Sequence, residues 1–444
     1  MKSAQDAEGK LYKVGLYTLG CKVSSYETEA VGEAFERAGF AVSDFDGVCD
    51  VYVINTCTVT AESDAKSRKY IRRAIRKNPD AVVIVMGCYS QRSPDEVSKI
   101  EGVSAVIGTA DKLSAPDIAI KLLSEREREK IIAVSSLAGA KFENMKISRA
   151  PRTRGYVKIE DGCECKCTYC AIAAARGPVR SKRPEDIIDE IKALYEGGTR
   201  EIVLTGIETG SYGADFKNGY GLGELLFELD AIGACDRIRL GSMAPELLSE
   251  KFITRVARLP ILVPHFHISM QSGSTRVLRE MKRRYTREMA LDNIRRIREY
   301  MPSVMLTADL MVGFPGESEE DFFETMSFVR EAELLDAHVF AYSRREGTPA
   351  ADRADQIPDA IKKERSSRLI AEKNRVRDGV LSGLVERGAP LKTVFETKRG
   401  SGYTGHSDSY VEVSVDSACD IRGEILDVIP THHKDGILFG RIEK

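Results

Sequence analysis

The 444-residue sequence contains no tryptophan and no apolar run long enough to cross a membrane. Its longest apolar stretches, such as AVVIVM at residues 81–86, have the length of a strand, whereas a membrane-spanning helix needs about 20 apolar residues. The first residues, MKSAQDAEGKLYKVG, contain neither the apolar segment nor the cleavage site of a secretory signal. These absences predict a cytoplasmic protein with no membrane anchor. Nothing in the sequence indicates an oligomeric state.

The net charge is also small, at −2, so any contact with nucleic acid must come from local basic patches. Residues 66–77 contain seven Lys or Arg and no acid, and residues 361–377 contain seven basic and two acidic residues. A solvated helix face is the usual meaning of such a run. The absence of acids in the first patch favours contact with phosphate groups.

A chain of this length is too long for one core, so several domains are expected. Alternating strand and helix patterns over 11–110 predict a parallel sheet with helices on its faces. Six more strand patterns alternate with helical stretches and predict an open or partial (β/α)6 barrel. Short strand-like segments with Gly and Asp turns then predict a small all-β domain. The six barrel strands are predicted at 156–160, 201–206, 237–242, 265–270, 305–314 and 337–343. The predicted divisions are an N-terminal α/β domain at 1–125, a linker at 126–148, the barrel at 149–378 and the β domain at 379–444.

Ten cysteines are present, and because the cytosol keeps thiols reduced, metal or redox chemistry is the expected reason for them. Cys21, Cys57 and Cys88 each follow a predicted strand, so they share the carboxyl edge of the sheet and are expected to converge. Cys49 precedes its strand and is assigned to the opposite edge. Three thiolates without a fourth ligand fit zinc poorly and fit an iron–sulfur cluster with one iron left open. Three coincidental core cysteines are the alternative.

The helix that follows the first strand is predicted over 24–39, with Ser24 and Glu27 spaced as a capping box.

A second group of cysteines lies in DGCECKCTYC, residues 161–170, directly after the first barrel strand. Cys163, Cys167 and Cys170 give the spacing C-x3-C-x2-C and leave Cys165 over. A zinc knuckle needs a second cysteine pair downstream, and none follows. A redox pair of Cys167 and Cys170 would leave Cys163 unexplained. The loop lies at the edge where barrel active sites form.

This spacing after the first strand of a barrel resembles the radical S-adenosylmethionine superfamily. The resemblance implies that Cys163, Cys167 and Cys170 hold a 4Fe-4S cluster whose fourth iron binds the amino and carboxylate groups of S-adenosylmethionine. It also implies reductive cleavage of S-adenosylmethionine to a 5′-deoxyadenosyl radical. Tyr169 matches the aromatic residue that usually precedes the last cysteine in that superfamily.

Over nearly its whole length the chain resembles the tRNA methylthiotransferases, which combine a three-cysteine N-terminal domain, a radical S-adenosylmethionine barrel and a small β domain of the TRAM type. The resemblance implies a second 4Fe-4S cluster on Cys21, Cys57 and Cys88 that carries or activates sulfur. It implies transfer of a methylthio group to C2 of an adenosine beside the anticodon, with tRNA as a partner and an electron donor such as flavodoxin or ferredoxin. The matching stretches are TLGCKV (18–23), INTCTVT (54–60), GCYSQ (87–91), RGPVRSK (176–182), LTGIETGSYG (204–213), HISMQSGS (267–274), GFPGES (313–318) and HVFAYSRREGTPA (338–350).

TLGCKV followed by YETE resembles the branch of the family that acts on threonylcarbamoyladenosine. The isopentenyladenosine branch usually has Gln and Met-Asn where this chain has Lys22, Val23 and Ser24. The alternatives are isopentenyladenosine as substrate, an aspartate of a ribosomal protein as substrate, and an RNA-binding protein whose clusters are structural or redox-sensing. The chain departs from the family pattern at Glu164, at the extra Cys165, and in the absence of a proline shortly after Cys170.

The remaining candidate residues lie in turns after barrel strands, where glycine lets the backbone approach a ligand. By resemblance, the predicted S-adenosylmethionine contacts are Tyr169, Gly206, Glu208, Gln271, Ser272, Gly313 and Gly316. Ordinary β/α turns are the alternative for the glycines, and a helix cap for Gln271 and Ser272. His265 and His267 are interpreted as core or pocket-wall residues. Tyr403, His406 and Tyr410 are predicted either to stack on RNA bases or to fill a small core.

Overall fold

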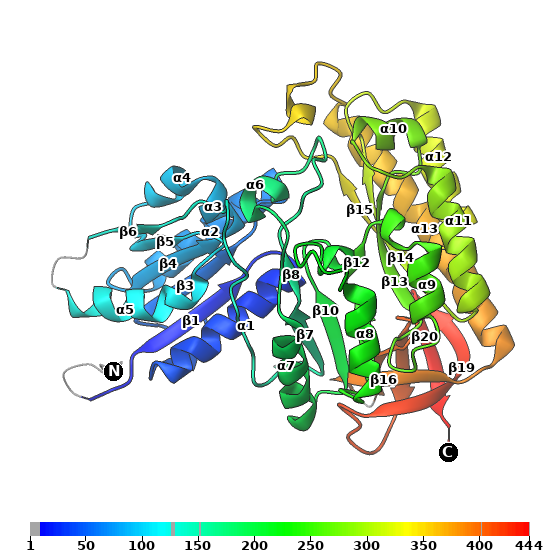
Figure 1. Cartoon of the computed structure of the whole chain (residues 1–444), viewed down its shortest axis with the longest axis horizontal. Coiled ribbons are helices and arrows are strands. Elements are labelled where there is room, and N and C mark those ends of the chain that lie inside the picture. Colours follow the sequence, from blue (N-terminus) through cyan, green and yellow to red (C-terminus); the bar gives the residue numbers. More distant parts are fainter. Residues whose placement is uncertain (1–8, 126–128, 151, 401, 444) are drawn as a thin grey trace.

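The computed structural model describes residues 9–125, 129–150, 152–400 and 402–443 (Figure 1). The N-terminal part is a six-stranded parallel sheet with the strand order β2-β1-β3-β4-β5-β6. Every residue of the central strands β3 and β4 is buried, because helices cover both faces of the sheet. The strands are β1 Lys13–Thr18, β2 Ala41–Ser43, β3 Val51–Thr56, β4 Val82–Gly87, β5 Ala105–Ile107 and β6 Ile131–Ala133. The helices are α1 Lys22–Arg37, α2 Ala61–Lys77, α3 Cys88–Arg92, α4 Pro94–Ser98, η1 Lys112–Ser114 and α5 Ala115–Ser124.

Strand β6 lies within residues 126–148, the stretch predicted as a linker, and pairs in parallel with β5. The sheet therefore continues into this range before the chain crosses to the barrel.

The middle of the chain forms the open barrel that the sequence predicts, with its helices on the outside (Figure 1). Six parallel strand positions follow in chain order, with the third interrupted at Gly241 between β11 and β12. The strands are β7 Arg154–Lys158, β10 Glu201–Thr205, β11 Arg237–Leu240, β12 Ser242–Met243, β13 His265–Gln271, β14 Met305–Val312 and β15 Asp336–Ala341. The helices are α7 Pro184–Glu196, α8 Leu222–Ala231, α9 Glu250–Val256, α10 Thr275–Glu280, α11 Arg287–Tyr300 and α12 Glu319–Glu331. Short elements between them are β8 Glu160–Asp161, α6 Ile172–Arg176, β9 Arg180–Ser181, η2 Thr209–Ser211, η3 Pro245–Leu247 and η4 Pro349–Asp352.

Side chains alternate along the barrel strands between an apolar outer face and a polar inner face. Outward residues such as Phe266, Ile268 and Leu306 belong to the large core that packs against the helices. Inward residues such as His267 and Asp309 contact one another instead. The inner face of the strands is therefore lined with groups that can bind a polar ligand.

Helix α13, Asp359–Arg387, extends past both ends of the basic stretch 361–377 and continues beyond residue 379, where the β domain was predicted to begin. Five of the seven basic residues of that stretch form ion pairs with carboxylates of the protein. Two of these pairs lie within the helix, and three attach it to Glu317, Glu319 and Asp336. The chain then forms a closed barrel with the strand order β16-β17-β18-β20-β19. Its strands are β16 Leu391–Arg399, β17 Gly402–Ser407, β18 Glu412–Asp416, β19 Ile425–Lys434 and β20 Ile437–Ile442.

This small barrel packs against the amino-terminal end of the β11 strand. Arg237 donates to the carbonyl oxygens of Lys392 and His406, and Arg239 donates to those of Ser407 and Asp408. The C-terminal domain is thereby fixed to the end of the partial barrel that lies opposite the cysteine loop.

The predicted stacking of C-terminal aromatic residues on RNA is wrong for Tyr403 and Tyr410, and it stays a prediction for His406, whose side chain is 25% exposed. Tyr403 is 1% exposed and belongs to the core of the small barrel. Tyr410 stacks between His265, at 4.5 Å, and His406, at 4.9 Å, so both of its faces are occupied by protein. The interpretation of His265 as a core residue is confirmed, because it is buried under this ring.

In the part of the chain that the structure describes, no helix has both the length and the apolar character that membrane crossing requires.

Candidate active site

The three N-terminal cysteines lie at the carboxyl ends of adjacent strands. Cys21 follows β1, Cys57 follows β3, and Cys88 is the first residue of α3 after β4. The sheet places β1, β3 and β4 side by side, and a Cβ added at Gly20 would lie 3.2 Å from Cβ of Cys57. The structure therefore brings the predicted trio together. Cys49 precedes β3 and lies at the opposite edge, as predicted.

Cys21 is the N-cap of α1, whose first turn contains no acidic residue and no side-chain cap. The free N–H groups at such a helix start favour negative charge. A cluster held by thiolates is anionic, so the start of α1 stabilises a Cys21 thiolate bound to a cluster more than it stabilises a neutral Cys21 thiol.

The four barrel cysteines lie in the loop between β8 and α6. The Cys163 backbone N–H donates to the carbonyl of Gly177, which closes the loop on itself. The Tyr169 ring packs edge-on against Phe314 at 6.5 Å, so the cysteine loop rests on the GFPGES turn. The Cys165 backbone N–H points to the Cys163 sulfur at 3.4 Å, and the Cys165 thiol also hydrogen-bonds with the Cys163 thiol, so the surplus cysteine lies directly beside the trio.

The sulfurs of neither cysteine trio all lie as close together as the ligands of one zinc ion. Sulfurs around one tetrahedral zinc lie about 3.8 Å apart, given a Zn–S bond of about 2.3 Å. Among the described residues only His267, Asp309 and His338 place three candidate ligand atoms within 4.8 Å of one another. Each cysteine trio is therefore wider than one ion needs and fits a larger group, namely a 4Fe-4S cluster held by three thiolates.

Each trio has an arginine that donates to one of its sulfurs, which sequence reasoning missed. Arg176 Nε donates to Cys88 Sγ at 3.1 Å, and Arg283 Nη1 donates to Cys167 Sγ at 3.3 Å. Hydrogen bonds to cluster sulfurs stabilise the charge on the cluster and tune its reduction potential. Both arginines are distant in sequence from the cysteines they contact, so no local spacing signals them.

Arg176 also belongs to a buried ion cluster that joins the N-terminal domain to the barrel. Glu27 from α1 pairs with Arg176, with Lys158 at 2.7 Å and with Lys112 at 3.2 Å. Asp161 pairs with Lys158 at 2.6 Å and with Arg176 at 3.3 Å. The six charged members are Glu27, Lys112, Lys158, Asp161, Arg176 and Arg180.

This ion cluster has more positive than negative charge. Burial acts to raise the pKa of Asp161, but Lys158 and Arg176 outweigh it and hold the pKa at about 2, so the carboxylate is charged. Burial likewise opposes ionisation of Glu27, and the cations around it hold its pKa well below the usual value. Two carboxylates thus face four cations, and the surplus positive charge lies against the Cys88 sulfur, where an anionic cluster would balance it.

Two buried carboxylates lie where the LTGIETG turn meets the first barrel strand. Glu160 accepts from the Glu208 backbone N–H at 2.9 Å through Oε2, while its buried Oε1 has no hydrogen-bond partner among the described residues. Glu208 accepts from the Ala244 backbone N–H at 3.0 Å, and burial raises its pKa to about 8. A Cβ at Gly206 would lie 2.5 Å from Glu160 Oε2, so only glycine allows this close approach. An unpaired buried acceptor indicates a missing donor such as an ammonium group.

The other predicted cofactor contacts have protein partners. The Ser272 hydroxyl accepts from the Ser274 backbone N–H at 3.1 Å within the turn before α10, whose N-cap is Ser274 and not Ser272. A Cβ at Gly313 would clash with Lys362, and one at Gly316 with Asp355. Gln271 ends β13 with a positive φ of 67° and is buried beside these turns.

Replacing Cys165 with alanine is expected to leave the iron content and cluster absorbance of anaerobically reconstituted protein unchanged, because the three ligands assigned to the barrel cluster remain. Cys163→Ala is the matched variant and should lose the barrel cluster. The reverse pattern, in which Cys165→Ala loses the absorbance and Cys163→Ala keeps it, would show that the ligands are grouped differently.

Comparison with known proteins agrees with this architecture. Residues 157–329 match the family model described as the Radical SAM superfamily, and residues 13–108 match the one described as Uncharacterized protein family UPF0004. The chain is 42% identical to the threonylcarbamoyladenosine tRNA methylthiotransferase MtaB of Bacillus subtilis (strain 168), covering 94% of this chain and 93% of that protein. It is 37% identical to the tRNA-2-methylthio-N(6)-dimethylallyladenosine synthase of the same organism, covering 82% of this chain and 72% of that protein.

Among solved structures, the radical S-adenosylmethionine methyltransferase TsrM from Kitasatospora setae aligns with a TM-score of 0.58 at 18% identity, covering 77% of each chain, which shows a shared fold. The two cysteine trios, the open barrel and the extent of these similarities lead to one assignment. The chain belongs to the tRNA methylthiotransferase family of radical S-adenosylmethionine enzymes.

Proposed function

We propose that this protein adds a methylthio group to C2 of N6-threonylcarbamoyladenosine next to the anticodon of tRNA, in the cytoplasm. The observation that carries the proposal is the pair of cysteine trios, each of which accepts a hydrogen bond from an arginine, Arg176 or Arg283. The threonylcarbamoyl substrate is supported by the comparison of two relatives from Bacillus subtilis. The threonylcarbamoyladenosine enzyme matches this chain at a higher identity, and over a larger share of both chains, than the dimethylallyladenosine enzyme does.

The reaction needs both trios, because C2 of adenine carries neither an acidic proton nor a leaving group. When bound, the barrel cluster supplies the electron that cleaves S-adenosylmethionine to a carbon radical, and the second cluster supplies the sulfur. Cys163, Cys167 and Cys170 would hold the first, and Cys21, Cys57 and Cys88 the second. An external electron donor such as flavodoxin or ferredoxin is part of the proposal.

The carboxylates at the LTGIETG turn are assigned to S-adenosylmethionine. Oε1 of Glu160 is positioned to accept from its ammonium group, and Glu208 holds the turn against Ala244. Gly206 keeps this approach open, and Tyr169 supports the cysteine loop from the other side. Gln271 is also assigned as a contact of S-adenosylmethionine, because it lies at the carboxyl end of β13.

Contact with tRNA is assigned mainly to the exposed side of α2. Three of its seven basic residues are paired with carboxylates, which are those of Glu62, Glu96 and Asp46. The four others have no ion pair among the described residues: Lys69, Arg72, Arg76 and Lys77. On the small barrel, His432 and Phe439 stack at 4.8 Å near the surface and offer a platform for a base.

The test is to digest tRNA from cells with and without the protein and to weigh the nucleosides. The mass increment of a methylthio group on threonylcarbamoyladenosine should disappear with the protein and return when it is restored. Disappearance from isopentenyladenosine instead would assign the other substrate, and no change in tRNA would contradict the proposal.

A further inference from the structure

Lys22 is a half-buried cation without a protein partner. It begins α1 directly after the cluster residue Cys21. The groups that act on its side chain electrostatically are Tyr410 and two residues of the barrel strands, Arg154 and Asp309, which places it beside the inner face of the barrel. Its ammonium makes no hydrogen bond or ion pair of 4 Å or less with any residue that the structure describes. Partly buried lysines are normally paired, so the position indicates an anion that is not part of the chain.

Each of the arginines Arg154, Arg237 and Arg239 has a carboxylate partner. Arg154 pairs with Glu396 at 2.8 Å, and Arg237 and Arg239 pair with Glu201 at 2.6 and 2.8 Å. These contacts fix the small barrel in place and leave none of these three arginines free for a ligand. Lys22 differs from these three arginines in having no ion pair with any residue that the structure describes.

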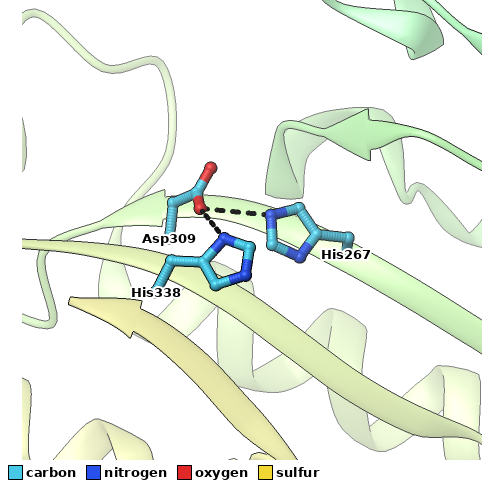
Figure 2. A group of neighbouring side chains, drawn as sticks. All are labelled: His267, Asp309 and His338. Atoms are coloured by element: carbon cyan, nitrogen blue, oxygen red, sulfur yellow. Dashed lines mark hydrogen bonds and ion pairs between the residues drawn. The ribbon is translucent and has the colours of Figure 1, made fainter. Parts of the chain in front are cut away.

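A second donor faces the same space. His267 Nε2 and His338 Nδ1 meet the same oxygen of Asp309, at 3.2 and 3.1 Å (Figure 2). The other ring nitrogen of His267 is bound to Thr307 at 2.8 Å, whereas the His338 side chain is 74% exposed and its Nε2 has no partner among the described residues. The hydrogen bond that His338 donates to the Asp309 carboxylate raises the pKa of His338 and so favours its charged form. Asp309 thus orients His338 as a donor toward the space beside Lys22.

We propose that Lys22 and His338 bind the carboxylate of the substrate's N6 substituent on the inner face of the barrel. The inference rests on the proposed function, which places the adenine C2 at the cluster of Cys21. Only N1 and C6 separate C2 from the N6 group, so a residue adjacent to Cys21 is suitably placed to meet that group. A threonylcarbamoyl group ends in a carboxylate, whereas an isopentenyl group has no charge. The pair would therefore distinguish acidic from neutral substituents.

The test compares anticodon stem-loops that carry threonylcarbamoyladenosine or its neutral methyl ester. Lys22→Met should weaken binding of the acid on the order of 30-fold, the effect of removing one partner of a desolvated charge pair, and should leave binding of the ester within about twofold. Lys192→Met on the exposed side of α7 is the matched control and should change neither. Iron content and S-adenosylmethionine cleavage should be unchanged in both variants.

Equal losses for acid and ester in Lys22→Met would overturn the assignment of Lys22 while leaving the proposed function intact. Wild-type protein that modifies only the isopentenyl stem-loop would overturn both. His338→Gln lies away from the cysteines and provides a second reading if Lys22→Met loses its cluster. This variant should bind the stem-loop with the acid several-fold more weakly and should bind the stem-loop with the ester as well as the wild type does. Equal binding of the acid by His338→Gln and wild type would contradict the proposal. An extra metal equivalent that disappears in Asp309→Asn would assign the histidines to a metal site instead.

Discussion

Replacing Arg176 with methionine is expected to cost about 3–5 kcal/mol of stability at the junction between the N-terminal domain and the barrel, and to weaken retention of the N-terminal cluster. The guanidinium is fully buried and contacts Glu27, Asp161 and the Cys88 sulfur. Removing it deprives two buried carboxylates of an ion-pair and hydrogen-bond partner and takes away a donor to the cluster. The measurement is the urea midpoint of the anaerobic protein together with its iron content after gel filtration.

Arg149→Met is the control for this prediction, because it removes an arginine from the same junction on the exposed side. Arg149 pairs with Glu36 while 69% of its side chain is exposed, and such pairs contribute about 0–1 kcal/mol. Equal effects of the two substitutions would show that the buried ion cluster does not hold the domains together.

The stability that the same ion cluster contributes is expected to be lost at low pH. The pKa of Asp161 falls from 3.8 to about 2 on folding, so its contribution is fully present above about pH 4 and is lost as the pH falls through 2. Other groups titrating in that range add to the effect, so the comparison of interest is wild type against Arg176→Met.

The backbone framework of the site could be predicted because it depends on local patterns. Apolar runs that alternate with helical segments place Cys21, Cys57 and Cys88 after strands, and parallel pairing then requires them to share one edge. The C-x3-C-x2-C loop follows the first barrel strand for the same reason. In each case the distance along the chain to the nearest strand end determines the position in space.

The partners of charged and aromatic side chains could not be predicted in this way. Glu27 is spaced from Ser24 as a capping box, but α1 begins at Lys22, and Glu27 lies in the ion cluster with a guanidinium 149 residues away. Tyr410 is an aromatic residue of the kind that stacks on RNA bases, yet the small barrel packs against β13 so that His265 covers the Tyr410 ring. Such contacts depend on how whole domains meet, and no spacing within one segment encodes them.

Substituting one cysteine in each trio is expected to separate the two halves of the reaction. Cys170→Ala should abolish cleavage of S-adenosylmethionine under strong reduction and lose about half of the iron, because two thiolates do not retain a four-iron cluster. Cys57→Ala should also lose about half of the iron but keep S-adenosylmethionine cleavage, since the barrel trio and Arg283 are untouched. Both variants should form no methylthiolated tRNA. The measurements are iron and sulfide content, release of 5′-deoxyadenosine, and nucleoside mass.

Cys235→Ala is the control for loss of a buried thiol, because Cys235 lies outside both trios and its sulfur contacts only the carbonyl of Arg237 among the described hydrogen-bonding partners. It should retain the full iron content and both activities. The assignment predicts that methylthio transfer can be lost while S-adenosylmethionine cleavage is kept, but not the reverse. Methylthio transfer requires radical formation, whereas radical formation does not require the N-terminal cluster. If Cys57→Ala lost cleavage of S-adenosylmethionine while retaining the barrel cluster, the two trios would not be separate sites. If Cys170→Ala retained cleavage, the radical would have to arise at the N-terminal trio.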